Sequence, residues 1–138
     1  MRIYIYLPVI LLLLIISFQI AAGSESQAEE RTIIAITSNG TSLDSEVSQN
    51  FGRCQYFLFY NYKEETLTVV ENPGVEMQSG AGRNAAELVI NNGADYVVTG
   101  NVGGNVESRL KGAGIQIVTG LTKSTTVKEA IEMVRSGL

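Results

Sequence analysis

The 138-residue chain contains no histidine, no tryptophan and a single cysteine, Cys54. One cysteine cannot form a disulfide within its own chain, and closed structural zinc sites need several Cys or His ligands. Without histidine, neither a Ser-His-Asp triad nor a Cys-His pair can be assembled. Histidine-based catalytic triads and closed structural zinc sites formed by a single chain are therefore excluded.

Basic residues are also scarce. After residue 23, nine Lys and Arg stand against fourteen Asp and Glu, which gives a net charge of −5. Nucleic-acid binding depends heavily on basic residues, so we expect no nucleic-acid partner. The remaining length is enough for one domain with its own hydrophobic core.

An apolar run extends from Ile3 to Ile20, behind Arg2. The small residues at 21–23 suit signal-peptidase cleavage, but about 18 apolar residues can also span a bilayer. Residues 1–23 are therefore predicted to be either a cleaved signal peptide or a membrane anchor. The acidic residues that follow agree with the positive-inside rule, so we expect an extracytoplasmic domain, secreted or anchored to the cell membrane by residues 3–20.

Residues 24–31 are polar and aperiodic, which is typical of a linker. The pattern beyond them predicts strands at 32–37, 55–61, 66–71, 96–99 and 115–118, and helices at about 82–92, about 105–111 and after Thr125 or Thr126. The second and third strands read as a hairpin, and the later alternation of strand and helix calls for parallel strands. We expect a three-layer α/β domain over 32–138, with a mixed sheet of about five strands and three helices.

Two glycine-rich stretches, SGAG at 79–82 and GNVGG at 100–104, each precede a predicted helix. The first fits the loose dinucleotide fingerprint G-x-G-x-x-A. That fingerprint should follow its strand at once and be followed by an acid about 20 residues later. Residues 72–79 intervene here and 100–106 contain no acid, so a dinucleotide site is disfavoured.

Two interpretations of these glycines remain open. They could permit a tight turn and close backbone packing. Alternatively, N–H groups at the two helix starts could bind an anion in one crevice at the carboxyl ends of the strands. The candidate residues of that anion site are Ser79, Gly80, Ala81, Gly82, Gly100, Asn101, Gly103 and Gly104.

Arg53 and Cys54 each allow two interpretations. The planar guanidinium of Arg53 could hold an anionic ligand, or it could pair with a local carboxylate such as Asp44 or Glu46. Cys54 could donate a thiolate to a metal, helped by the adjacent cation, or it could be a small buried core residue.

Five stretches, in order, resemble the dinitrogenase iron–molybdenum cofactor biosynthesis family. They are IAITSNGTSLDSEVSQNFGRCQYFLFY, VENPG, SGAGRNAAELVINNGADYVVTGNVGGN, LKGAGIQIVTG and TVKEAIE. S-x-x-F-G-R at 48–53, combined with G-A-D-x-V-x-x-G-N-x-G at 93–103, makes the resemblance specific. It implies an RNase-H-like α/β fold that binds or handles an iron–sulfur or iron–molybdenum type cluster.

The chain departs from that family in two ways. Relatives often carry a histidine just before F-G-R, where this chain has Asn50, a poor ligand for cluster iron. Relatives that handle nitrogenase cofactor work in the cytoplasm, whereas this chain is predicted to be exported.

The sequence thus predicts a non-enzymatic binding or carrier domain for such a cluster or a related anionic metallocofactor. The alternative is a small-anion-binding or protein-interaction domain that has lost its metal. A hydrolase of the RNase-H-like kind fits less well. Such sites need several carboxylates to hold metal ions, and the predicted strands carry few.

Overall fold

The computed structural model describes residues 32–137. The predictions made for residues 1–23 and for the linker at 24–31 lie outside the described residues. Within residues 32–137, no helix combines the length and the apolar content that crossing a membrane requires.

The predicted strands and helices are all present, with ends that differ by about one residue from the prediction. The strands are β1 (Ile33–Ser38), β2 (Tyr56–Asn61), β3 (Thr66–Glu71), β4 (Tyr96–Val98) and β5 (Gln116–Val118). The helices are the short 3-10 turn η2 (Pro73–Val75) and the α-helices α2 (Ala81–Asn91), α3 (Gly104–Gly112) and α4 (Val127–Arg135). The turn η2 was not predicted.

The five strands form one sheet in the order β3-β2-β1-β4-β5. β2 pairs antiparallel with both β1 and β3, whereas β4 pairs parallel with β1 and β5. β1, β3, β4 and β5 therefore run in one direction, and their carboxyl ends meet at one edge of the sheet. This confirms the predicted mixed sheet and places the loops after these four strands together.

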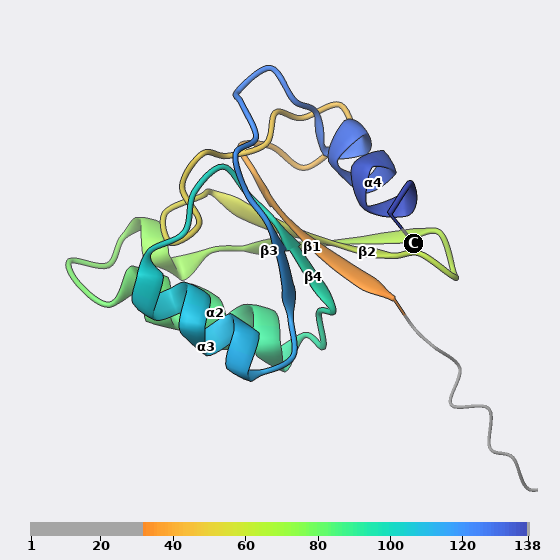
Figure 1. Cartoon of the computed structure of the whole chain (residues 1–138). Coiled ribbons are helices and arrows are strands. Elements are labelled where there is room, and N and C mark those ends of the chain that lie inside the picture. Colours follow the sequence, from red (N-terminus) through yellow and green to blue (C-terminus); the bar gives the residue numbers. More distant parts are fainter. Residues whose placement is uncertain (1–31, 138) are drawn as a thin grey trace, which may run out of the picture. The chain divides into compact units, whose positions relative to one another are not determined.

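Helices cover both faces of the sheet. Figure 1 shows α2 and α3 side by side on one face and α4 on the other. Because side chains alternate along a strand, Ala35 and Phe57 pack toward α2 and α3, while Ile34, Ile36 and Leu58 pack toward α4. The domain thus has two cores, one on each side of the sheet, in three layers.

The start of α4 is fully satisfied by the protein itself. The Thr126 side chain accepts a hydrogen bond from the Glu129 N–H, and the Glu129 carboxylate accepts one from the Thr126 N–H at 2.7 Å. This capping box is joined by two loop carbonyls, since the N–H groups of Val127 and Lys128 donate to Ser45 O and Leu43 O. No donor at the first turn of α4 is left for a ligand.

Candidate functional site

A crevice of about 610 Å³ opens at the edge where the parallel strands end. After β1 the chain turns to β2 on one side, and after β4 it continues toward β5 on the other, so the two loops diverge. Open α/β sheets bind ligands at such a switch point. The residues that line the crevice are Gln49, Asn50, Phe51, Gly52, Arg53, Ala81, Gly82, Asn101, Val102, Gly103 and Val106.

Three segments meet at the floor of the crevice because glycines allow it. A Cβ placed on Gly52 would lie 3.0 Å from the N and Cα atoms of Gly82. A Cβ on Gly82 would in turn lie 3.0 Å from Cγ2 of Val106. The turn at 51–53 therefore packs directly on the backbone at the start of α2, and the Val106 side chain of α3 packs on Gly82. This supports the close-packing interpretation of Gly82.

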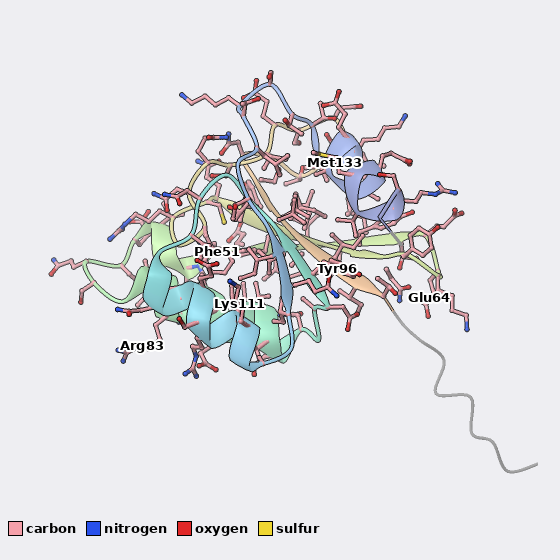
Figure 2. The ribbon with its side chains drawn as sticks, in the orientation of Figure 1. Phe51, Glu64, Arg83, Tyr96, Lys111 and Met133 are labelled. Atoms are coloured by element: carbon pink, nitrogen blue, oxygen red, sulfur yellow. The ribbon has the colours of Figure 1, made fainter. Side chains whose placement is uncertain are left out.

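Buried hydrogen bonds hold the loop after β1 against the loop after β4. The Thr37 hydroxyl lies 2.9 Å from both the Thr99 hydroxyl and the Ser48 carbonyl. The Phe51 N–H donates to Asn101 O at 3.2 Å. Phe51 itself is 2 % exposed and lies between the sheet and the two helices (Figure 2). One wall of the crevice is thus anchored in the core.

The helix starts at the crevice differ from the start of α4. Both α2 and α3 begin after a glycine, Gly80 and Gly103, so no side chain caps them. Within the described part of the chain, the first three N–H groups of each helix have no protein partner. They belong to Ala81, Gly82 and Arg83 in α2, and to Gly104, Asn105 and Val106 in α3.

The charge around the crevice favours an anion. Its lining contains one cation, Arg53, and no carboxylate. The N-terminal ends of α2 and α3 add the positive ends of two helix dipoles. Arg83, which is also in the first turn of α2, projects away from the sheet and is not part of the lining (Figure 2). Uncapped N–H groups at helix starts beside an arginine are a recurrent anion-binding arrangement.

Arg53 also makes hydrogen bonds outside the crevice. Its Nη1 donates to Met77 O at 2.8 Å and to Gly74 O at 3.4 Å. This corrects the alternative in which Arg53 pairs with a local carboxylate, because within residues 32–137 its acceptors are two backbone carbonyls. A guanidinium has five donors, so the same group can hold this loop and also donate to a ligand.

Cys54 is 1 % exposed and belongs to the core between the sheet and α2 and α3. Its Sγ lies 3.4 Å from the Phe51 carbonyl, to which the thiol donates. Burial raises the pKa of the Cys54 thiol to about 12, so the thiol stays protonated near neutral pH. These contacts favour the core interpretation of Cys54 over ligation. Among the described residues, no three Cys, Asp or Glu side chains gather as a metal site.

The crevice brings together five of the predicted site residues, which are Arg53, Ala81, Gly82, Asn101 and Gly103. Four others, Ser79, Gly80, Gly100 and Gly104, lie beside it in the chain but do not line it. Gly80 has a φ of 75°, a left-handed conformation that favours glycine.

Sequence reasoning missed two classes of lining residue. Phe51, Val102 and Val106 supply apolar walls, and Gln49 and Gly52 supply part of the rim and floor. Gly52 could have been found from the F-G-R motif, of which it is part. Val106 could not, because it reaches the crevice only through the position of α3 in the fold.

The fold and the crevice together define a small α/β domain with one mixed sheet and an open crevice where its parallel strands end. The sequence profile of the dinitrogenase iron-molybdenum cofactor family matches residues 30–137. The chain therefore belongs to this family, whose membership indicates a cofactor-binding or carrier role.

The chain is also similar to individual proteins. An uncharacterized protein of Methanocaldococcus jannaschii is 27% identical over 97 residues, covering 68% of this chain and 80% of that protein. The apo form of the orange protein from Desulfovibrio gigas is 32% identical with a TM-score of 0.73, covering 80% of this chain and 92% of that one. A Thermotoga protein of the DUF35 family, provisionally assigned as NifB, is 31% identical with a TM-score of 0.65, covering 77% of this chain and 89% of that one.

Proposed function

We propose that this domain binds an anionic metal cluster of the iron–sulfur or iron–molybdenum type without covalent ligation, as a non-enzymatic binding or carrier protein. The observation that carries the proposal is the contrast between helix starts. The first N–H groups of α4 donate to protein acceptors, whereas within residues 32–137 the first three N–H groups of α2 and of α3 have no protein acceptor. Three of these six open groups belong to residues that line the crevice with Arg53, namely Ala81, Gly82 and Val106. These donors suit the terminal sulfur or oxygen atoms of an anionic cluster.

The donor set fits a cluster that arrives with its own ligands. The crevice lining contains no cysteine, histidine or carboxylate that could coordinate iron directly. Its volume, about 610 Å³, lies within the range of ordinary ligand pockets, and a single small oxyanion would leave much of it empty. Part of the lining is apolar, from Phe51, Val102 and Val106. Apolar walls suit a large anion with sulfide at its surface better than a strongly hydrated oxyanion.

Absence of acid–base machinery supports a non-enzymatic role. The lining residues include no carboxylate, and the chain has no histidine. General acid–base catalysis needs such a group within hydrogen-bond reach of the substrate.

Two matched anions test the proposal. Tetrathiomolybdate and molybdate share charge and shape but present sulfide or oxide, and each is titrated into the full-length chain without oxygen. We expect tetrathiomolybdate to bind at least about tenfold more tightly, and Arg53→Gln to weaken it while Lys123→Gln, outside the crevice, does not. Equal binding of both anions would favour the small-anion alternative, and no binding of either would reject the proposal.

Metal content tests the role of Cys54. The full-length chain and Cys54→Ser are purified without oxygen, and iron and molybdenum are measured beside the absorption spectrum. Because the thiol is buried and donates to Phe51 O, we expect equal metal content in both proteins. Metal that falls in step with the Cys54→Ser substitution would instead make Cys54 a ligand.

We further propose that residues 1–23 export the domain, either as a cleaved signal or as an anchor. The proposal rests on the apolar run at 3–20 and the small residues at 21–23. Cell fractionation with mass spectrometry of the N-terminus tests it. A chain that starts at Ser24 outside the cytoplasm indicates cleavage, and an intact chain in the membrane fraction indicates anchoring. An intact chain in the cytoplasm would contradict export.

A further inference from the structure

Asn72 is a buried polar residue that follows β3 and does not line the crevice. It is 4 % exposed. Its side-chain Nδ2 donates to Gly52 O at 3.1 Å and to Cys54 O at 2.9 Å, and its Oδ1 accepts from the Gly74 N–H at 3.0 Å. Its own N–H donates to Gln55 O at 2.9 Å. One amide thus satisfies groups on two separate loops.

These bonds join the turn at 51–54 to the segment that leads into α2. Gly74 sits so close that a Cβ there would lie 2.4 Å from Gly52 O. Arg53 joins the same two segments, because it lies in the turn and its guanidinium donates to Gly74 O and Met77 O. The β3–α2 segment is therefore held to the F-G-R turn at two points, by the buried amide of Asn72 and by the guanidinium of Arg53.

The two joined segments carry different parts of the anion site. The turn supplies Gly52 and Arg53, and the segment from Asn72 ends at the open N–H groups of α2. If the segments separated, the cation and the α2 donors would no longer face one crevice. We propose that Asn72 is a positioning residue, which sets the distance between Arg53 and the start of α2 and so determines affinity for the anion. This inference rests on the proposed function of that crevice.

The chain offers matched controls for a test. Asn72→Ser keeps a hydroxyl that can accept from Gly74 N–H in an ST-turn, but serine is too short to bridge to both carbonyls. Asn92→Ala removes a similar bond at the other end of α2, where the Asn92 amide donates to Leu88 O at 2.7 Å. Thr126→Ala removes the α4 cap on the opposite face of the sheet, and so controls for a general loss of stability.

The first measurement needs no ligand. Hydrogen exchange is followed at the Phe51 amide, which donates to Asn101 O, and at the Asn84 amide, which donates to Gly80 O in the first turn of α2. We expect Asn72→Ser to speed exchange at both amides by at least about tenfold more than in β1 or α4. Neither control should do so. Equal acceleration throughout the domain would overturn the inference, because Asn72 would then serve stability alone.

The second measurement is a double-mutant cycle with Arg53→Gln, using tetrathiomolybdate as the probe. Asn72→Ser should weaken binding roughly tenfold in the wild-type background and less than about threefold in Arg53→Gln, because Asn72 acts through the placement of Arg53. Asn92→Ala should stay within about twofold. Additive losses, or unchanged binding in Asn72→Ser, would overturn the inference. Absence of binding in the wild type would reject the proposed function instead, and the exchange experiment would still test Asn72.

Discussion

At the scale of single residues, the buried thiol of Cys54 makes the free energy of unfolding depend on pH. The unfolded chain loses the thiol proton near its usual pKa of 9.0, whereas burial keeps it in the folded state up to about pH 12. Between these values the unfolded state binds fewer protons, so the free energy of unfolding falls as pH rises, by up to about 1.4 kcal/mol per pH unit. Below about pH 8 the thiol is protonated in both states and contributes no slope.

Urea unfolding of the wild type and Cys54→Ala at about pH 8 and about pH 10.5 measures this slope. The two proteins share every other ionisable side chain, so the difference between them isolates the thiol. We expect the wild type to lose more stability than Cys54→Ala over this interval. Parallel losses would show that the thiol is open to solvent and available as a ligand.

The sequence left Cys54 and Arg53 each with two interpretations, for a physical reason. The type of side chain permits both a ligand-binding and a structural role for each residue. Which role it takes depends on contacts with residues that are distant in the sequence. Arg53 finds its acceptors at Gly74 and Met77, and Cys54 is buried beneath Asn72. No local pattern around F-G-R-C identifies partners about 20 residues away.

At the scale of elements, the starts of α2 and α3 have no side-chain cap among the described residues, which leaves their first N–H groups for the proposed ligand. Gly103 has an extended backbone, with φ −70° and ψ 149°, and a Cβ placed on it would meet open space. An aspartate there can cap α3 and accept from the N–H groups that we assign to the ligand. We expect Gly103→Asp to stabilise the domain by a few tenths of a kcal/mol and to weaken tetrathiomolybdate binding at least about tenfold.

Gly103→Ala is the control that distinguishes the effect of capping α3 from the effect of adding any side chain at this position. Alanine adds a Cβ in the same open space but no acceptor, so binding should stay within about threefold of wild type. Thermal unfolding and titration of both variants give the two quantities. If Gly103→Ala and Gly103→Asp bind equally well, the N–H groups of α3 take no part in binding.

Gly80 and Gly112 make a second pair at the element scale. Gly80 has a left-handed φ of 75° at the start of α2, whereas Gly112 is helical at the end of α3. We expect Gly80→Ala to lower the free energy of unfolding by about 1–2 kcal/mol. We expect Gly112→Ala to raise it by about 0.5–1 kcal/mol. Chemical denaturation measures both changes. A neutral Gly80→Ala would mean that the α2 start tolerates other backbone geometries.

Elements were predictable because their signals are local. The alternation at 66–71 and the apolar spacing in the last helix mark β3 and α4 directly. The order of the strands could be predicted only in part. The β-hairpin and the parallel crossovers follow from connection lengths, but the side of β1 on which each strand lies does not. The turn η2 and the contact of Gly52 with Gly82 depend on how separate segments pack, so the sequence alone could not show them.

At the scale of the whole molecule, the crevice is a positive site in an acidic protein. Residues after 23 carry a net charge of −5, yet the crevice holds Arg53 and two helix N-termini. A dianion therefore meets long-range repulsion and short-range attraction. Salt screens exposed charges over about 10 Å at 0.1 M, so the sign of the salt effect reports which of the two dominates.

We expect tetrathiomolybdate binding to the wild type to weaken several-fold between about 20 and about 200 mM NaCl, because salt screens the exposed Arg53. Arg53→Gln removes this attraction and makes the molecule more acidic by one charge. In that variant the repulsion from the rest of the protein dominates, so the same salt increase should leave binding unchanged or strengthen it. Lys123→Gln changes the net charge equally but lies outside the crevice, and should keep the wild-type direction. Weakening by salt in all three proteins alike would show that the attraction comes from the overall surface and not from Arg53.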